Sequence, residues 1–265
     1  MSVTGARVAA WFLAATMVAP LASCTPAPPP AAAARYFPLH ADDTWVYEVV
    51  QPLRNVRAHM TVRVRGEQYV KPLRRSCQVV DETYDTPDAA QQAFRDPGLP
   101  RDIHPVAYCR DNGFFHRALS LEYADGEVRE AGPNSGEERF LPVGLQPDAE
   151  WQGVTTAYVA GGRDEYTVMH THHATLETAA IVVPAGRFTD CMRVDTVALH
   201  GELHDGRYQT NPVVLYYSDW YAPDVGLVRT VQRESADGSL PLAQVELVAY
   251  DVKGAVRPAA GGPGR

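Results

Sequence analysis

His59-Met60-Thr61-Val62-Arg63-Val64-Arg65 is the stretch of sequence that decides the fold. Polar and apolar side chains alternate along it, and a period of two is that of a β-strand, whose successive side chains point to opposite faces. The three apolar residues would therefore face a core, and the four polar residues would face solvent. Trp45-Val46-Tyr47-Glu48-Val49 contains the same spacing of large apolar residues. These stretches predict antiparallel strands around one core.

Turn signals separate many strand-like runs along the chain. Asn112-Gly113 and Asp125-Gly126 are typical of hairpin turns that need positive φ at both central residues. Further strand-like runs lie near residues 151–160, 164–176, 192–200, 207–218, 226–234 and 243–252. We expect an all-β, mainly antiparallel domain whose large curved sheet forms a half-open barrel or splits into a sandwich.

One short helix is predicted near residues 87–95. Thr86 is a suitable N-cap, Pro87 fits the first helical position, and Asp88 favours the positive end of the helix dipole. Asp96-Pro97-Gly98 would end this helix.

The N-terminal segment has the pattern of an export signal. Arg7 precedes an uncharged run from Val8 to Ala22, which is shorter than the roughly 20 apolar residues of a membrane-spanning helix. Leu21-Ala22-Ser23-Cys24 ends this segment and resembles the lipobox of bacterial lipoproteins. The resemblance implies that Cys24 is diacylated and becomes the first residue of the mature protein, which would anchor it firmly. An ordinary secretory signal cut near Ala22 or Ser23 is the alternative.

The chain divides into a signal peptide (1–23), a Pro/Ala-rich tether (24–35), a single β domain (36–253) and a tail (254–265) that we expect to be disordered. The tether favours an extended conformation and would span about 30 Å. Thr25, rather than an aspartate, follows Cys24. In Gram-negative lipoproteins this resemblance implies an outer-membrane anchor facing the periplasm. In other bacteria the anchor would lie on the outer face of the cell membrane.

Charge and motifs argue against several classes of function. The formal net charge of −8 becomes −9 when Arg7 is removed with the signal peptide. An acidic chain without a basic run argues against nucleic acid as a partner and against electrostatic docking to anionic lipid. The sequence contains no Gly-x-Ser-x-Gly elbow, phosphate loop, dinucleotide-binding glycine pattern or His-Glu-x-x-His motif. We expect a protein that is not an enzyme and has no cofactor.

Three cysteines remain in the domain once Cys24 is set aside: Cys77, Cys109 and Cys191. In an oxidising compartment they can form at most one intramolecular disulfide. Cys77 and Cys109 lie in strand-like runs that are close in sequence and are the favoured pair. Cys191 would then be a buried free thiol.

His170, His172 and His173 form the one cluster of residue types suited to catalysis or metal binding. On a strand, His170 and His172 share a face and His173 lies on the other. Two imidazoles are half of a zinc site, which needs a third protein ligand. The candidates for that ligand are His200, His204 and Asp205. A solvent-facing polar patch is the alternative, so we predict no metal centre and keep His170 and His172 as candidate ligands.

Carboxylates and aromatic residues indicate no site by themselves. Glu137 and Glu138 are adjacent, so on a strand they would face opposite sides and be solvated. Aromatic residues gather between Tyr216 and Tyr221. We expect them to pack within the sheet, with a contact face for lipid or carbohydrate as the alternative.

Three segments stand at the start, middle and end of the domain. They are Tyr36-Phe37-Pro38-Leu39 with Thr44-Trp45-Val46-Tyr47, Val183-Pro184-Ala185-Gly186-Arg187-Phe188-Thr189-Asp190-Cys191, and Trp220-Tyr221-Ala222-Pro223-Asp224-Val225-Gly226-Leu227-Val228-Arg229. Together they resemble a group of poorly characterised bacterial lipoproteins and secreted β proteins. The resemblance implies a curved antiparallel sheet like the half-open barrels of lipoprotein carriers, with no established activity.

We therefore expect a membrane-anchored lipoprotein that is a non-enzymatic binding or scaffold module of the cell envelope. Its ligand would be a lipid or another apolar molecule in a half-barrel. The alternatives are an accessory subunit of an envelope protein complex and a His-dependent metal-binding enzyme. An open apolar concavity would favour the carrier, a filled interior the scaffold, and a third ligand beside His170 and His172 the enzyme.

Overall fold

The structure, a computed structural model, describes residues 35–84, 103–118, 121–130, 137–158, 165–204, 207–208, 213–238 and 240–255. The signal peptide, Cys24 and the helix predicted near 87–95 lie outside these residues, as does most of the tether and of the tail. Within the described ranges, no helix has both the length and the apolar composition needed to span a membrane.

Strands make up nearly all of the regular structure in the described ranges. One 3-10 turn, η1 (Pro52–Arg54), interrupts them. The strands are β1 (Thr44–Gln51), β2 (Val56–Val70), β3 (Arg75–Tyr84), β4 (His104–Asp111), β5 (Phe114–Ala118), β6 (Leu121–Ala124), β7 (Glu127–Glu130), β8 (Glu138–Pro142), β9 (Glu150–Tyr158), β10 (Glu165–Leu176), β11 (Ile181–Val183), β12 (Gly186–Phe188), β13 (Met192–His204), β14 (Arg207–Tyr208), β15 (Val213–Ala222), β16 (Gly226–Arg233) and β17 (Ala243–Asp251).

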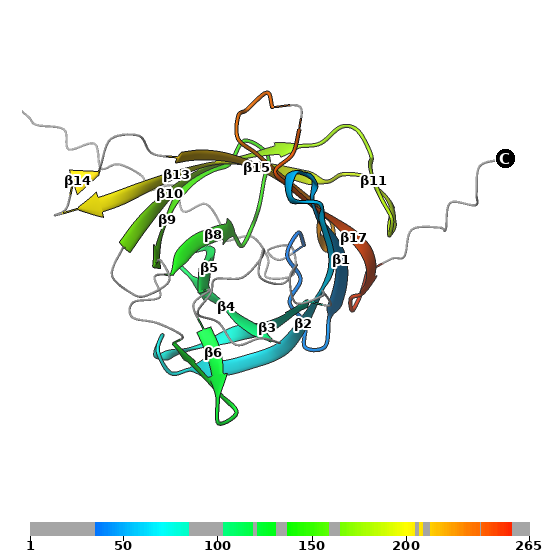
Figure 1. Cartoon of the computed structure of the whole chain (residues 1–265). Coiled ribbons are helices and arrows are strands. Elements are labelled where there is room, and N and C mark those ends of the chain that lie inside the picture. Colours follow the sequence, from blue (N-terminus) through cyan, green and yellow to red (C-terminus); the bar gives the residue numbers. More distant parts are fainter. Residues whose placement is uncertain are drawn as a thin grey trace, which may run out of the picture.

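One antiparallel sheet contains most of these strands, in the order β8-β5-β4-β3-β2-β1-β17-β16-β15-β13-β10-β9, with β14 paired to β13. The sheet curls until it nearly closes into a barrel (Figure 1). Two hairpins, β6-β7 and β11-β12, lie outside this sheet. The predicted all-β antiparallel class is therefore confirmed, and of the two expected architectures the barrel is the one observed.

The first and last strands of the domain lie side by side in the middle of the sheet. β1 pairs with β2 on one edge and with β17 on the other, so that Thr44 is opposite Asp251. Asp43, just before β1, is buried and accepts hydrogen bonds from the backbone N–H of His40 and of Lys253, both at 2.9 Å. These bonds fix both ends of the domain to each other.

β8 and β9 are the two ends of the strand order, and they meet at the seam of the barrel. No backbone ladder joins them in the described residues. Instead, the indole N–H of Trp151 on β9 donates a hydrogen bond to the carbonyl of Phe140 on β8, at 3.1 Å. Side chains therefore close the barrel where backbone pairing ends.

The predicted turns and disulfide are present. Asn112-Gly113 and Asp125-Gly126 adopt positive φ at all four residues, as hairpin turns of this kind require. A disulfide joins Cys77 on β3 to Cys109 on the neighbouring β4, with 4.4 Å between their Cα atoms. Cys191 is buried and free.

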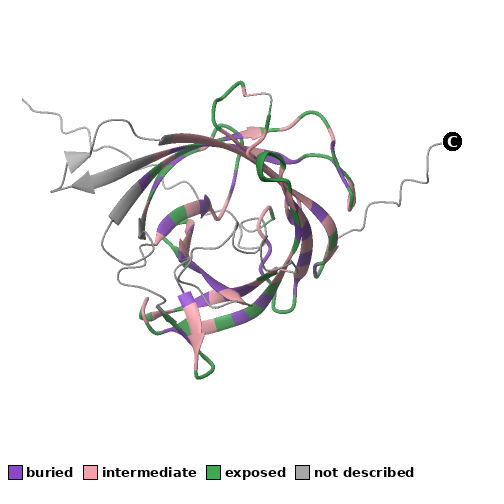
Figure 2. Ribbon diagram, in the orientation of Figure 1, coloured by how far each residue is buried: buried purple, intermediate pink, exposed green. Residues whose placement is uncertain are grey.

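The core follows the alternation that the sequence shows. Trp45, Tyr47 and Val49 on β1 are each only 4% exposed, and the residues between them are partly buried. Buried residues alternate with partly buried or exposed ones along several strands (Figure 2). Val64 is fully buried, but Met60 and Val62 are only partly buried. These two residues face a cavity rather than a filled interior.

Hydrogen bonds join the first and the third of the segments that carry the resemblance. The indole N–H of Trp45 donates to the carbonyl of Val225 at 2.7 Å, and the hydroxyl of Tyr47 donates to the carbonyl of Leu227 at 3.0 Å. Gly226 has a φ of +97° and packs against Pro38 and Trp45. The turn before β16 therefore lies against the start of β1.

Candidate functional site

A cavity of about 590 Å³ lies inside the barrel. Most of its lining is aromatic or aliphatic, with a smaller set of polar and charged side chains. The lining residues are Phe37, Leu39, Trp45, Tyr47, Val49, Gln51, Met60, Val62, Val80, Glu82, Tyr84, Tyr108, Arg117, Glu138, Phe140, Leu141, Thr155, Val168, His170, His172, Val194, Thr196, Tyr217, Asp219, Tyr221, Gly226, Leu227, Thr230, Gln232, Ala243 and Val245. This volume is in the range of small-molecule sites, roughly 300–1,000 Å³.

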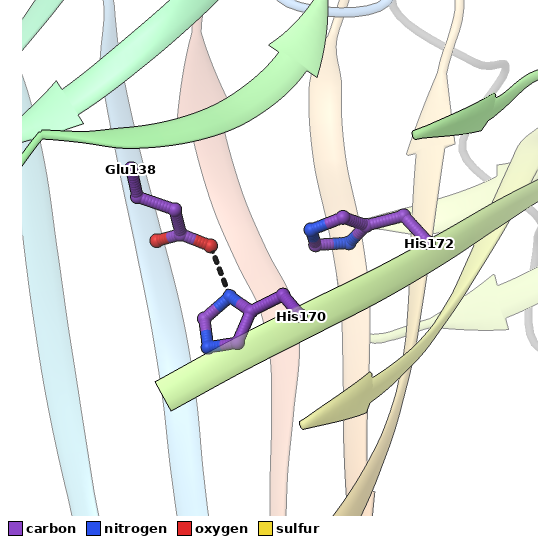
Figure 3. Close-up of side chains that lie close together, drawn as sticks. All are labelled: Glu138, His170 and His172. Carbon is purple, nitrogen blue, oxygen red and sulfur yellow. Dashed lines mark hydrogen bonds and ion pairs between the residues drawn. The ribbon is translucent and has the colours of Figure 1, made fainter. Parts of the chain in front are cut away.

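Glu138 is the centre of the polar part of the lining. It lies on β8, is 1% exposed, and divides its carboxylate between two partners. The guanidinium of Arg117, opposite it on β5, donates to Oε2 at 2.7 Å, and Nδ1 of His170 on β10 is hydrogen-bonded to Oε1 (Figure 3). Burial by itself would raise the pKa of Glu138, but Arg117 and His170 outweigh it and lower the pKa to about 2.

The Glu138–His170 bond crosses the seam. The strand β9 lies between β10 and the seam, so the Glu138 side chain reaches past it to contact β10. Arg117 also stacks its guanidinium over the ring of Phe140, 4.4 Å from the ring centroid. Glu138 is thus held by hydrogen bonds from both sides of the barrel seam.

His172 is the second imidazole of the site and is 5% exposed. Its ring stacks on Trp151, with 4.8 Å between centroids, and its Nδ1 is hydrogen-bonded to the hydroxyl of Thr196 at 2.8 Å. Its Nε2 is buried without a hydrogen-bond partner in the described residues. Burial lowers the pKa of His172 to about 4, so the ring is neutral at pH 7.

Gly153 on β9 makes room for this cluster. A Cβ at this position would lie 2.8 Å from the carbonyl oxygen of Arg139, 3.3 Å from Cγ of Glu138 and 3.6 Å from Nε2 of His172. Because glycine has no side chain, β8 and the side chains of Glu138 and His172 can approach β9 closely.

Two further acids line the same cavity. Burial raises the pKa of Asp219 on β15 to about 6, although Oγ1 of Thr230 donates a hydrogen bond to it at 2.7 Å. Burial also raises the pKa of Glu82 on β3, and Arg117 acts against that rise. The cavity therefore combines apolar walls with acids of unequal proton affinity.

The structure brings His170 and His172 together, as predicted from their spacing, and adds Glu138 as a third group. One ligand atom from each of these residues lies within 4.8 Å of the others, and this is the one such group in the described residues. The expected third ligands, His200 and His204, stand opposite Val168 and Arg207 in the register. Asp205 is outside the described residues.

The expectation that Glu138 is solvated is wrong. Glu137, just before β8, pairs with Arg75, whereas Glu138 on β8 points into the barrel. The aromatic segment near 216–221 is divided in the same way. Tyr217 and Tyr221 line the cavity, and Trp220 lies outside that lining, with its indole N–H donating to Glu177 at 3.3 Å.

The fold defines a class of antiparallel barrels with a single seam, and two solved structures resemble it. A "putative lipoprotein" from Parabacteroides distasonis ATCC 8503 has 16% identity and a TM-score of 0.50, over 82% of this chain and 98% of that chain. A "putative exported protein" with a YmcC-like fold from Bacteroides fragilis NCTC 9343 has 14% identity and a TM-score of 0.48, over 81% of this chain and 98% of that chain. At such identities the likeness concerns the fold alone. Neither a protein-family model nor a curated protein sequence matches the chain.

Proposed function

We propose that this protein is a lipid-anchored, non-enzymatic binding protein of the bacterial envelope, whose barrel holds an apolar or amphiphilic ligand. The observation that carries the proposal is the cavity of about 590 Å³ inside the sheet. A scaffold with no ligand would gain stability by filling such a space with side chains, because unfilled volume in a core is destabilising.

The lining supports a ligand with a long apolar part and a polar end. Phe37, Leu39, Met60, Val62 and Val245 offer apolar surface. The Arg117–Glu138–His170 cluster offers hydrogen-bonding groups in the lining of the same cavity. Pockets that are mostly apolar, with a few placed polar groups, are typical of lipid-sized ligands.

The anchor at Cys24 supports the place of action. Its lipobox pattern follows an export-type segment, and the Pro/Ala-rich tether would hold the barrel about 30 Å from the membrane. One of the two proteins of similar fold is itself described as a lipoprotein. In a Gram-negative cell, Thr25 after Cys24 favours the outer membrane, with the barrel in the periplasm.

The test compares ligand capture by two matched variants on one strand. Val62 on β2 lines the cavity, and its neighbour Thr61 does not. Val62→Trp should fill the cavity and weaken binding of the apolar dye N-phenyl-1-naphthylamine at least about 10-fold, as loss of most of an apolar site implies. Thr61→Trp should bind the dye like the parent.

Purification of the protein from membranes is a second test of the same proposal. The parent protein should copurify with extractable lipid, detected by mass spectrometry, and Val62→Trp should not. Equal dye binding by both tryptophan variants, or capture of a protein partner without any lipid, would favour the scaffold role in an envelope complex instead.

A further inference from the structure

We infer that Glu138, His170 and His172 form a binding site for a zinc-like divalent cation on the wall of the barrel cavity. This inference concerns the polar part of the cavity lining, and it does not depend on the anchor or on the identity of the apolar ligand. Two imidazole nitrogens and one carboxylate oxygen are a donor set that zinc binds in proteins, with a further position left for water or another ligand.

The geometry is close to that of a bound site. The three ligand atoms lie within 4.8 Å of one another. Donors on one tetrahedral zinc ion at about 2.0–2.1 Å lie roughly 3.4 Å apart, so side-chain movements on the order of 1 Å would complete the site. Nδ1 of His170 and Oε1 of Glu138 already share a hydrogen bond. A cation would take the place of the hydrogen between these residues.

His172 supplies an independent observation. It is 95% buried, its Nε2 has no hydrogen-bond partner in the described residues, and the ring points toward Glu138 and His170 (Figure 3). Leaving a buried polar atom unpaired costs about 1–3 kcal/mol, and such an atom in a native site calls for a partner. A cation bound by Nε2 would provide that partner.

Neighbouring residues orient the three ligands, as residues that hydrogen-bond to the ligands do in metal sites. The hydroxyl of Thr196 binds Nδ1 of His172 at 2.8 Å, which leaves Nε2 as the ligand atom. Arg117 holds Oε2 of Glu138 and leaves Oε1 directed to the histidines. Gly153 keeps the space between Glu138 and Nε2 of His172 clear of a side chain.

Arg117 also limits the affinity, because its charge repels a cation. The guanidinium neutralises Glu138, so the site carries no net negative charge to attract the ion. Selectivity would therefore come from the imidazole donors, which favour zinc and its transition-metal neighbours over calcium and magnesium. The remaining coordination position faces the cavity, since all three ligands belong to its lining.

The experiment is calorimetry with ZnCl₂ on the full mature chain, without an affinity tag and with Cys24→Ala to keep it out of membranes. We expect one zinc ion per chain. His172→Ala and His170→Ala should each weaken binding at least about 10-fold. The matched control is His173→Ala, because His173 is exposed on the same strand and contacts Thr175 rather than Glu138. It should bind zinc like the parent.

A measurement on the parent protein avoids dependence on variant folding. Co²⁺ should give the visible absorption of a four-coordinate site, and EDTA should remove it. Zinc should also raise the thermal midpoint of the parent and not of His172→Ala. No heat and no Co²⁺ absorption in the parent, equal weakening by His173→Ala, or binding of Mg²⁺ and Ca²⁺ in preference to zinc would overturn the site.

Discussion

Glu138 gives one carboxylate oxygen to Arg117 and the other to His170, and so links strands from both sides of the barrel seam. Both partners lower the pKa of this buried acid, so removing either of them should cost stability. The contacts of Glu138 and its neighbours therefore predict how substitutions change the free energy of unfolding.

Arg117→Met should destabilise the fold strongly. The variant leaves the 2%-exposed carboxylate of Glu138 without its main counter-charge, and breaking a buried ion pair on one side costs about 3–5 kcal/mol. Urea unfolding followed by tryptophan fluorescence measures the change. Arg63→Met is the control, because the Arg63–Asp42 pair is exposed on both sides and should contribute less than about 1 kcal/mol. Similar losses from both variants would show that the Glu138 pair has no special role.

Asp219 should make stability fall as the pH rises from about 4 to about 6. The pKa of Asp219 is raised from 3.8 to about 6, so in this window the folded state binds a proton that the unfolded state has lost. A shift of this size corresponds to at most about 3 kcal/mol, and about half is expected because the side chain faces a cavity.

Asp219→Asn isolates this effect. At pH 7 the variant should be more stable than the parent by about 1–2 kcal/mol, and near pH 4 the advantage should vanish. Asp42→Asn gives the opposite sign, because Arg63 lowers the pKa of the exposed Asp42 and its contribution is lost as the pH falls. Urea titrations between pH 4 and pH 8 would contradict the assignment if the parent–D219N difference did not change with pH.

Gly153→Ala should damage the seam. The added methyl would meet the Arg139 carbonyl at 2.8 Å, and this atom belongs to backbone that cannot rotate away. Overpacking of this kind costs about 1–3 kcal/mol. Gly113→Ala tests a different cause in the same protein: its surroundings are open, so only its positive φ should matter, at about 1 kcal/mol. If Gly113→Ala lowers the thermal midpoint more than Gly153→Ala does, the close approach at Gly153 is contradicted.

The disulfide should be a major source of stability. Cys77 and Cys109 are 32 residues apart, and closing a loop of this length contributes about 3–4 kcal/mol in the chain-entropy description. The double variant Cys77→Ala, Cys109→Ala should lose about this much in urea unfolding. On the unreduced, denatured protein with Cys24→Ala, a thiol reagent should count one cysteine, Cys191. A count of three would exclude the bridge.

Cys24→Ala should release the protein from the membrane. Loss of the acylated cysteine removes the two chains that make attachment stable. Metabolic labelling with a palmitate analogue and membrane fractionation should both lose their signal. A variant that stays in the membrane fraction would show that something other than Cys24 anchors the chain.

Local rules predicted the strands and turns well, because they depend on neighbouring residues. The alternation in His59–Arg65 and the Asn112-Gly113 pair each determine structure within a few residues. The choice of a barrel over a sandwich could not be read in this way. It depends on whether β8 and β9 meet, and the contacts that join them, such as Trp151 to Phe140, connect segments whose approach is set by the curvature of the whole sheet.

The site shows the same division. The shared face of His170 and His172 follows from strand geometry and was predicted. Glu138 was missed because adjacency to Glu137 says only that the two side chains point apart, not which one points inward. The register supplies the answer: β8 pairs with β5 so that Glu138 stands opposite Arg117, past an irregularity between Phe115 and His116. No motif in the sequence encodes that register.

We expect the pairing of β1 with β17 to form late in folding. The strands from β2 to β5 and from β15 to β17 pair with strands that are near in sequence. The two halves of the sheet join only when β1 pairs with β17, which places Thr44 opposite Asp251. Contacts between residues so distant in sequence form slowly, and a chain that emerges from its N-terminus completes them last. Deleting Ala243–Asp251 would therefore divide the sheet through its middle, whereas loss of an edge strand would only shorten it.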